Sequence, residues 1–258
     1  MFSQRRLEIL YVANSGILIS SKDKKVLIDG IHATNVPPYF PVPPRYIEKM
    51  LAEQDPFDDI SILFFTHHHT DHFDPDLTND MLKQNQHMQL IGTSSVLNML
   101  STCENYDEAY ASQIRPISLP RHKSLQMSLR SIPFEVTSLF HDGETYQSVE
   151  NFSYLIEIKN KLILHVGDAQ PSASNFQSSD MTGKKVDVLI VPFPFIGLAS
   201  GRQIINSMDP QHVIVTHLPD KNQDEGNYLF NTYNVYKKYS SKLPKTTFFT
   251  KPGQKISI

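Results

Sequence analysis

The stretch from Thr66 to Pro75, THHHTDHFDP, constrains this chain more than any other, because it places four histidines and two aspartates in ten residues. It directly follows DDISILFF, an apolar run typical of a buried strand. His67 and His69 are two residues apart, so on a strand or its extended continuation their side chains point the same way. Two imidazoles on one side can converge on a single metal ion.

Asp71 and His72 form a second pair in the same stretch. Adjacent residues on a strand point to opposite faces, so these two can share a metal only where the backbone curls into a loop. The pattern therefore predicts two ligand pairs offset along one loop, an arrangement suited to two neighbouring metal ions. A polar surface loop is the alternative interpretation, and the fixed His-x-His-x-Asp-His spacing at a strand end disfavours it.

Histidine and carboxylate ligands suit zinc, iron or manganese. The one cysteine, Cys103, excludes an internal disulfide and a multi-cysteine zinc site. The net charge of −3 does not direct the chain toward nucleic acid or an anionic membrane. No apolar run approaches the roughly 18 residues of a spanning helix, and the N-terminus lacks the features of a signal peptide. We therefore expect a cytoplasmic protein without a membrane partner.

Apolar segments indicate strands on both sides of helical stretches, without a shift in composition that would mark a second domain, so we expect a single domain over residues 1–258. Helices are expected near 47–54, after Pro75, at 94–101 and at 226–240, while 104–123 carries no clear pattern. The predicted strands are 7–12, 16–20, 25–30, 60–66, 88–93, 124–131, 134–140, 152–158, 161–169, 186–193, 212–218 and 246–250.

Residues 15–30 and 152–168 follow the same outline. Each is an apolar strand, a short polar turn with lysines, and a second apolar strand that ends near an aspartate. Each is followed by a further strand that leads into a loop. The two similar halves predict a duplicated β-rich unit packed face to face, with helices outside.

The stretch THHHTDH resembles the His-x-His-x-Asp-His signature of the metallo-β-lactamase superfamily, and the other elements of that pattern follow in order over nearly the whole chain. The family's mid-chain histidine matches TSLFHDGE, its Gly-Asp pair matches LHVGDA, its last histidine matches VIVTHL, and its early aspartate matches VLIDG. The resemblance implies an α/β fold, the four-layer αββα sandwich. The general layout is similar to the ascorbate-6-phosphate lactonase-like and phospholipase-D-like members.

Carried over onto these positions, the resemblance implies a binuclear metal site with one bridging carboxylate. The first ion is held by His67, His69 and His141, the second by Asp71, His72 and His217, and Asp168 bridges both. The ions are expected to be two divalent metals, zinc first, with manganese or iron as alternatives. Two such ions about 3.5–4 Å apart lower the pKa of a bound water toward about 7 and stabilise a developing oxyanion. Asp71 is expected to be catalytic as well, by orienting that water.

The resemblance therefore implies a metal-dependent hydrolase that uses a metal-bound hydroxide on a small ester, lactone or phosphodiester. The His-x-His pair, in place of the His-x-Glu of diiron flavoproteins, favours hydrolysis. Asp168 stands where some lactamases have cysteine, which argues against antibiotic hydrolysis. A non-catalytic metal-binding or sensor protein is the alternative from another class, and the intact set of seven ligands disfavours it.

An RNase Z-type nuclease shares the same ligands and is a further alternative. It also needs an RNA-binding arm and a basic face, and neither is visible in the sequence. We therefore expect a small-molecule substrate as the partner and no nucleic acid. Arg121, Arg202 and Lys221 are candidates for contacts with an anionic substrate.

The residues around the ligands carry their own expectations. His68 lies between two ligands and should point away from the metals. His165 is expected to be packed or hydrogen-bonded in the core, and His32 to reach the rim of the cleft. Asp29 is a candidate to hydrogen-bond the second nitrogen of a ligand histidine, with a role as a strand-end turn residue as the equal alternative. The proline-rich loop 35–46 is predicted to wall the cleft and tune substrate choice, unless it is a rigid surface connection.

Overall fold

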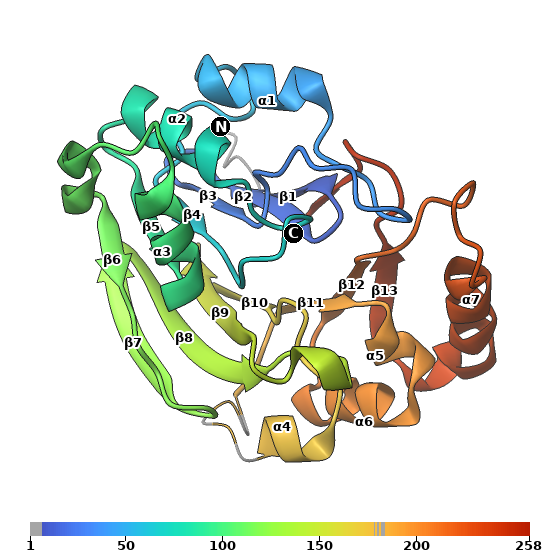
Figure 1. The fold of residues 1–258 in the computed structure, drawn as a ribbon. Coiled ribbons are helices and arrows are strands. Elements are labelled where there is room, and N and C mark those ends of the chain that lie inside the picture. The colour runs from blue at the N-terminus through green and yellow to red at the C-terminus, as the bar shows by residue number, and fades with distance from the viewer. Residues whose placement is uncertain (1–6, 178, 180, 182–183) are drawn as a thin grey trace, which may run out of the picture.

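Two β-sheets pack face to face, and helices cover the outer side of each (Figure 1). The structure is a computed structural model that describes residues 7–177, 179, 181 and 184–258. This arrangement of layers is the αββα sandwich that the sequence predicts. None of the described helices combines the length and the apolar character that crossing a bilayer requires.

The first sheet is antiparallel at one edge and parallel at the other. Its strands are, in spatial order, β14 (Lys255–Ser257), β1 (Glu8–Ala13), β2 (Gly16–Ser20), β3 (Lys25–Ile28), β4 (Ile62–Phe64), β5 (Gln89–Gly92) and β6 (Ile114–Pro116). Pairing is antiparallel from β14 to β3 and parallel from β3 to β6. Associated with it are α1 (Pro44–Leu51), α2 (Pro75–Gln84), α3 (Ser94–Thr102) and the 3-10 helix η1 (Glu108–Ser112).

The second sheet repeats this plan. Its strands are, in the corresponding order, β7 (Ser124–Leu129), β8 (Ile132–Phe140), β9 (Glu150–Ile158), β10 (Lys161–His165), β11 (Val188–Pro192), β12 (His212–Thr216) and β13 (Lys245–Phe248). Pairing is antiparallel from β7 to β10 and parallel from β10 to β13. The accompanying helices are α4 (Ala173–Gln177), α5 (Pro194–Gly197), α6 (Ala199–Met208), α7 (Tyr228–Tyr239), η2 (Glu144–Tyr146) and η3 (Ser240–Lys242).

The predicted internal repeat corresponds to the hairpins β2–β3 and β9–β10, which occupy equivalent places in the two sheets. In both sheets the hairpin is followed by three parallel strands. The carboxyl ends of β3 and β4 therefore lie at one edge of the first sheet, and those of β10, β11 and β12 lie at one edge of the second.

Side chains alternate between two apolar layers along each central strand. Ile62 and Phe64 of β4 enter the core between the sheets, whereas Leu63 packs under the helices of the first half. In β11, Ile190 enters the same central core and Leu189 packs against the helices of the second half. Strands buried on both faces read as continuous apolar runs, and each fully buried aliphatic side chain contributes about 1.5–3 kcal/mol.

Several elements differ from the sequence predictions, and one of them is β6, which lies in the stretch 104–123 that carries no clear pattern. The chain does not finish with the strand near 246–250, because β14 follows it and pairs with β1. Helices α4, α5 and α6 were not expected. The helix predicted to follow Pro75 begins at Pro75 itself, because the Asp74 carboxylate accepts a hydrogen bond from the backbone N–H of Leu77 (3.0 Å) and caps the first turn.

Candidate metal centre

The loop after β4 curls as the ligand spacing requires. The backbone N–H groups of His72 and Phe73 both donate to the carbonyl of His69 (2.9 and 3.0 Å). Phe73 also bridges to Ile31, which ties the loop to the segment after β3. This turn brings the side chains of Asp71 and His72 to the same side as His67 and His69, although adjacent residues on a strand would diverge.

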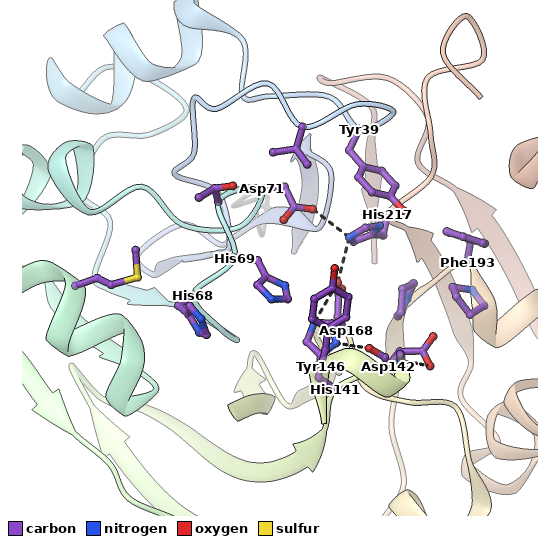
Figure 2. A pocket seen from close by; sticks show the side chains of 16 residues that line it. Tyr39, His68, His69, Asp71, His141, Asp142, Tyr146, Asp168, Phe193 and His217 are labelled. Atoms are coloured by element: carbon purple, nitrogen blue, oxygen red, sulfur yellow. Dashed lines mark hydrogen bonds and ion pairs between the residues drawn. The ribbon is translucent and has the colours of Figure 1, made fainter. Parts of the chain in front are cut away.

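The second half supplies three further side chains from three separate strand ends. His141 follows β8, Asp168 follows β10 after Val166 and Gly167, and His217 follows β12. Figure 2 shows His141, Asp168 and His217 gathered opposite His69 and Asp71. All seven predicted ligands lie in overlapping clusters that can hold a metal ion, with ligand atoms within 4.8 Å of one another: His67, His69 and His141; His67, His72 and Asp168; and Asp71, His72 and His217.

Asp168 lies between the cluster that contains His141 and the cluster that contains His217. Its Oδ2 is 3.1 Å from Nε2 of His217, 3.4 Å from Nε2 of His72 and 3.8 Å from Nε2 of His141. Nε2 of His217 is also 3.4 Å from Oδ2 of Asp71. The position of Asp168 is the one that a bridging ligand would need.

Buried polar atoms in the centre lack partners. Nε2 of His67, His72 and His141 and Oδ1 of Asp168 are buried without a hydrogen bond in the structure. Buried polar atoms are rarely left unpaired, and here three nitrogens and one carboxylate oxygen face the same space. Divalent cations bound in this space would satisfy these atoms, and the donor set fits zinc, manganese or iron.

The hydrogen bonds behind the histidines set their tautomers. The Thr66 hydroxyl donates its one proton to Oδ2 of Asp29 (2.6 Å), so Nδ1 of His67 must donate to the Thr66 oxygen (3.0 Å). Nδ1 of His72 donates to Asp29 (2.9 Å). Each ring is therefore left with Nε2 as the atom that faces the centre.

His141 has the same orientation by a different contact. Its Nδ1 donates to the backbone carbonyl of Asp142 (2.6 Å), which again leaves Nε2 toward the centre. Asp71 is held by Asn14, whose side-chain amide donates to the Asp71 carbonyl (2.9 Å) and to its Oδ2 (3.0 Å). The centre is thus positioned by a surrounding set of polar contacts, which typically support metal affinity.

Asp29 has both of the roles considered for it. It lies at a strand end with φ +46°, and its Oδ1 accepts from the backbone N–H of Thr66 (2.8 Å) while its Oδ2 accepts from His72. The side chain is fully buried. This contact confirms the prediction that Asp29 hydrogen-bonds the second nitrogen of a candidate ligand histidine.

The histidines of the centre are of two kinds, those with a lowered pKa and those with a raised pKa. Burial and the neighbouring histidines hold the pKa of His67 well below its usual range, and burial with His141 and His72 lowers the pKa of His69 to about 4. Burial also opposes a charge on His72, but the carboxylates of Asp168 and Asp71 outweigh it and raise its pKa to about 10.

The pKa of His217 is raised in the same way. Burial lowers it, but the carboxylate of Asp168 outweighs burial, and the pKa lies well above the usual value. A proton on these two rings therefore occupies, in the metal-free protein, the place that a cation would take.

Gly167 allows the two halves to approach each other at this point. Its φ is +59°, and a Cβ there would lie 2.5 Å from Oδ1 of Asn151 and 2.7 Å from Cβ of Thr66. Asn151 in turn accepts from the backbone N–H of Asp168 (3.0 Å). The glycine of the Gly-Asp pair is thus required by both its backbone angle and its contacts.

A cavity of about 630 Å³ opens over the centre. Val36 and Tyr39 of the proline-rich loop line it, and the Tyr39 ring lies 4.1 Å from that of His217. The prediction that this loop walls the cleft is therefore confirmed. On the opposite side, the ring of Tyr146 lies 5.0 Å from His69 and 5.3 Å from His141. Nothing in the sequence pattern pointed to Tyr146.

The remaining histidines divide into correct and wrong expectations. His68 belongs to none of the candidate clusters, as expected, although its ring lines the cavity wall. His165 is buried and hydrogen-bonded as predicted: its Nε2 donates to the Ser15 carbonyl (3.0 Å) and its Nδ1 accepts from the N–H of Gly167 (3.1 Å). The expectation for His32 is wrong, because it is fully buried instead of at the rim, and this burial lowers its pKa to about 4.

The fold and this arrangement of histidines and aspartates agree with the family that the sequence matches. The family model described as "Beta-lactamase superfamily domain" matches residues 25–218. The chain belongs to the metallo-β-lactamase superfamily. A search of curated proteins finds no match.

Solved structures with the same fold are distant in sequence. A possible metal-dependent hydrolase from Veillonella parvula is 14% identical, with a TM-score of 0.68 over 98% of this chain and 100% of that one. An isothiocyanate hydrolase from Delia radicum gut bacteria is 12% identical, with a TM-score of 0.65 over 97% and 99%. CmlA, a diiron β-hydroxylase from Streptomyces venezuelae, is 13% identical, with a TM-score of 0.64 over 98% and 54%. At these identities the likeness concerns the fold.

Proposed function

We propose that the protein is a metal-dependent hydrolase of a small ester, lactone or phosphodiester, with two metal ions held by the seven predicted ligands. The observation that carries this proposal is the convergence of three histidine Nε2 atoms and Asp168 Oδ1, all buried and without a hydrogen bond, beneath a cavity. A site that only stabilised the fold would not need a cavity of this size above it.

Divalent ions bound there would acidify a water molecule and stabilise the negative charge that develops on the substrate. The chain's own residues would do the rest. Asp71 faces the cavity, and the Asn14 amide fixes its carboxylate, so that the carboxylate can accept a hydrogen bond from the attacking water and orient it. Tyr39 and Tyr146 stand on either side of the reacting position, where their rings limit the access of bulk water.

Zinc is the proposed metal, with manganese or iron as alternatives, because histidine and carboxylate ligands suit all three. A diiron hydroxylase has the same fold, so the metal must be identified together with the reaction. Lactones are included among the substrates because the layout is similar to that of lactonase-like members of the superfamily. An isothiocyanate hydrolase has the same fold, so isothiocyanates should be tested as substrates too.

The test combines metal analysis with a hydrolysis screen. Protein purified without a histidine tag should contain up to two equivalents of transition metal. The loaded protein should hydrolyse at least one member of a panel of 4-nitrophenyl esters, lactones, bis-4-nitrophenyl phosphate and an aryl isothiocyanate. Protein that cannot bind added zinc or manganese would contradict the site. Fully loaded protein that hydrolyses no member of the panel would instead favour a non-catalytic metal-binding role.

A further inference from the structure

The cavity over the metal centre contains no lysine or arginine among the described residues that line it. Its anionic side chains are Asp71 and Asp168, which belong to the metal centre, and Asp142, which does not. Apart from the centre itself, the described part of the wall therefore offers a negatively charged group no lysine or arginine as a partner.

The arginines that the sequence suggested for anion binding are used elsewhere. Nη1 of Arg202 donates to the backbone carbonyls of Ile196 (2.6 Å) and Gly197 (2.9 Å), and its guanidinium lies 4.3 Å from the centre of the Tyr239 ring. It therefore satisfies carbonyls of α5 and stacks on an aromatic face, and it does not line the cavity.

Arg121 is used in the same way. It donates to the carbonyls of Leu139 (2.7 Å) and Val149 (2.7 Å) and lies over the Phe140 ring. Lys221 is exposed and does not line the cavity. The cationic groups that sequence reasoning assigned to an anionic substrate are thus not available at the wall.

Most of the remaining wall is apolar. Val36 and Met99 line it from the first half, and Pro192, Phe193 and Pro194 line it from the second. The tyrosine rings described above add aromatic faces, and Figure 2 shows Phe193 on the far side of the cavity from His69. The apolar surface extends beyond the cavity, because the ring of Tyr228 packs against that of Phe193, with their centres 5.5 Å apart.

We infer that the substrate is an ester or lactone whose remainder, away from the bond that is cleaved, is uncharged and apolar or aromatic; this inference rests on the proposed function. Negative charge on the reacting group is matched by the metal centre. A carboxylate or phosphate elsewhere in the substrate would lose water without gaining a cation, which is costly, and would lie in a cavity that also contains Asp142. Lactones that carry a remote phosphate are therefore poor substrates.

Two esters that differ by one charge test this inference. 4-Nitrophenyl hexanoate and mono-4-nitrophenyl adipate have the same leaving group and the same chain length, but the adipate ends in a carboxylate. We expect kcat/KM to be at least about tenfold higher for the hexanoate, from the cost of burying an unpaired charge. Equal values, or a preference for the adipate, would overturn the inference.

A binding measurement separates this inference from the proposed function. N-(4-nitrophenyl)hexanamide and the corresponding mono-amide of adipic acid resist hydrolysis, and calorimetry can measure their binding to metal-free protein. There no metal ion can take the carboxylate, and the protonated ring of His217 is already paired with Asp71 and Asp168. The neutral amide should bind at least about tenfold more tightly. If loaded protein hydrolyses neither ester, ester hydrolysis is wrong, and the amide pair still decides the character of the cavity.

A charge placed on the wall provides the matched variant. Val36→Lys puts a cation at the cavity, whereas Leu125→Lys puts the same charge on β7, at a position that is 41% exposed and does not line the cavity. Val36→Lys should reduce the preference for the neutral ester and the neutral amide by about threefold or more, and Leu125→Lys should leave both as in the wild type. Equal effects of the two variants would show that the wall does not set the preference.

Discussion

Asp29 and Asp168 end equivalent hairpins in the two halves, and they contact opposite nitrogens of the same histidine. Asp29 follows β3 directly and accepts from Nδ1 of His72 at 2.9 Å. Asp168 is separated from β10 by two residues, and its carboxylate lies 3.4 Å from Nε2 of that ring. Because two residues separate Asp168 from its strand, its carboxylate lies in the centre itself, whereas that of Asp29 lies behind the ring of His72. Topology places an aspartate at each strand end, and a shift of two residues decides its role.

The loops after β4 and β11 show the same contrast. They occupy equivalent positions, yet the first contains four of the seven candidate ligands and the second begins with Phe193 and Pro194. Both line the cavity. One half therefore supplies a compact group of candidate ligands, while the other supplies single candidate ligands from separate strand ends together with an apolar wall.

The largest effect is expected from Asp168. Replacement by alanine removes the negative charge from between two proposed dications, so Asp168→Ala should lower hydrolysis by about 100-fold or more and reduce bound metal. His68→Ala, which changes a residue outside the candidate clusters, should retain its metal and change the rate by only about a few fold. Metal stoichiometry and turnover of both variants decide between these outcomes. Two metals and full activity in Asp168→Ala would show that the ligand assignment is wrong.

Asp29 should have a smaller effect that acts through His72. Asp29→Asn keeps the size of the side chain but weakens its bonds to His72 and Thr66, so metal affinity should fall by about 10- to 100-fold, the usual scale for residues that position a ligand. Zinc titration against a competing chelator measures this. With saturating metal, Asp29→Asn should recover much of its activity, whereas Asp168→Ala should not. Equal recovery of activity in the two variants would show that Asp29 and Asp168 do not differ in their roles.

Metal uptake should depend on pH, because each half supplies one histidine with a raised pKa. His72, with a pKa of about 10, and His217 hold protons at neutral pH in the metal-free protein, and ligation requires their loss. Zinc binding near pH 7 should therefore release about two protons, and affinity should rise with pH. Calorimetry in two buffers of different ionisation enthalpy counts these protons. No release would contradict the carboxylate environment described for these rings.

The same protons affect the stability of the metal-free protein. A raised pKa stabilises the folded state fully below the unfolded value of about 6.5, and this contribution is lost as the pH rises toward the folded value of about 10 for His72. Denaturant unfolding should therefore show the metal-free protein losing stability above pH 6.5. Zinc-loaded protein should lose less over this range, since the metal replaces the protons.

The smallest effect on activity is expected from His165, which links the halves without facing the centre. His165→Leu leaves the Ser15 carbonyl and the Gly167 N–H without partners, and each such loss costs about 1–3 kcal/mol of stability. The unfolding midpoint should fall, while metal stoichiometry should stay at the wild-type value. Loss of metal at full folding would instead assign His165 to the centre.

The sequence predicted the first half of the centre better than the second, for a physical reason. His67 to His72 are close in the chain, and their spacing alone indicates a metal site. His141, Asp168 and His217 converge only through the sandwich, so the resemblance to the family was needed to select them. The ring of Tyr146, in a short 3-10 helix, has no comparable signal.

The missed elements have local causes. The three residues of β14 are too few to show a strand pattern, and their partner β1 is at the other end of the chain. Helix α6 contains Gly201, which disfavours helix in isolation. In the structure a Cβ at Gly201 would lie 2.4 Å from Cα of Phe195, so the glycine permits α5 and α6 to approach closely. Tertiary packing explains both features, and neither can be read from a short window of sequence.

The pairing of β14 with β1 also sets an order of events at the ribosome. Ile9 pairs with Ile256, so the neighbour of β1 emerges only after about 250 further residues have been made. At about 5–20 residues per second this interval lasts on the order of ten seconds or more. Until then β1 presents an open edge, and open edges invite pairing with other chains. A chaperone that protects the nascent chain is therefore expected to bind at β1.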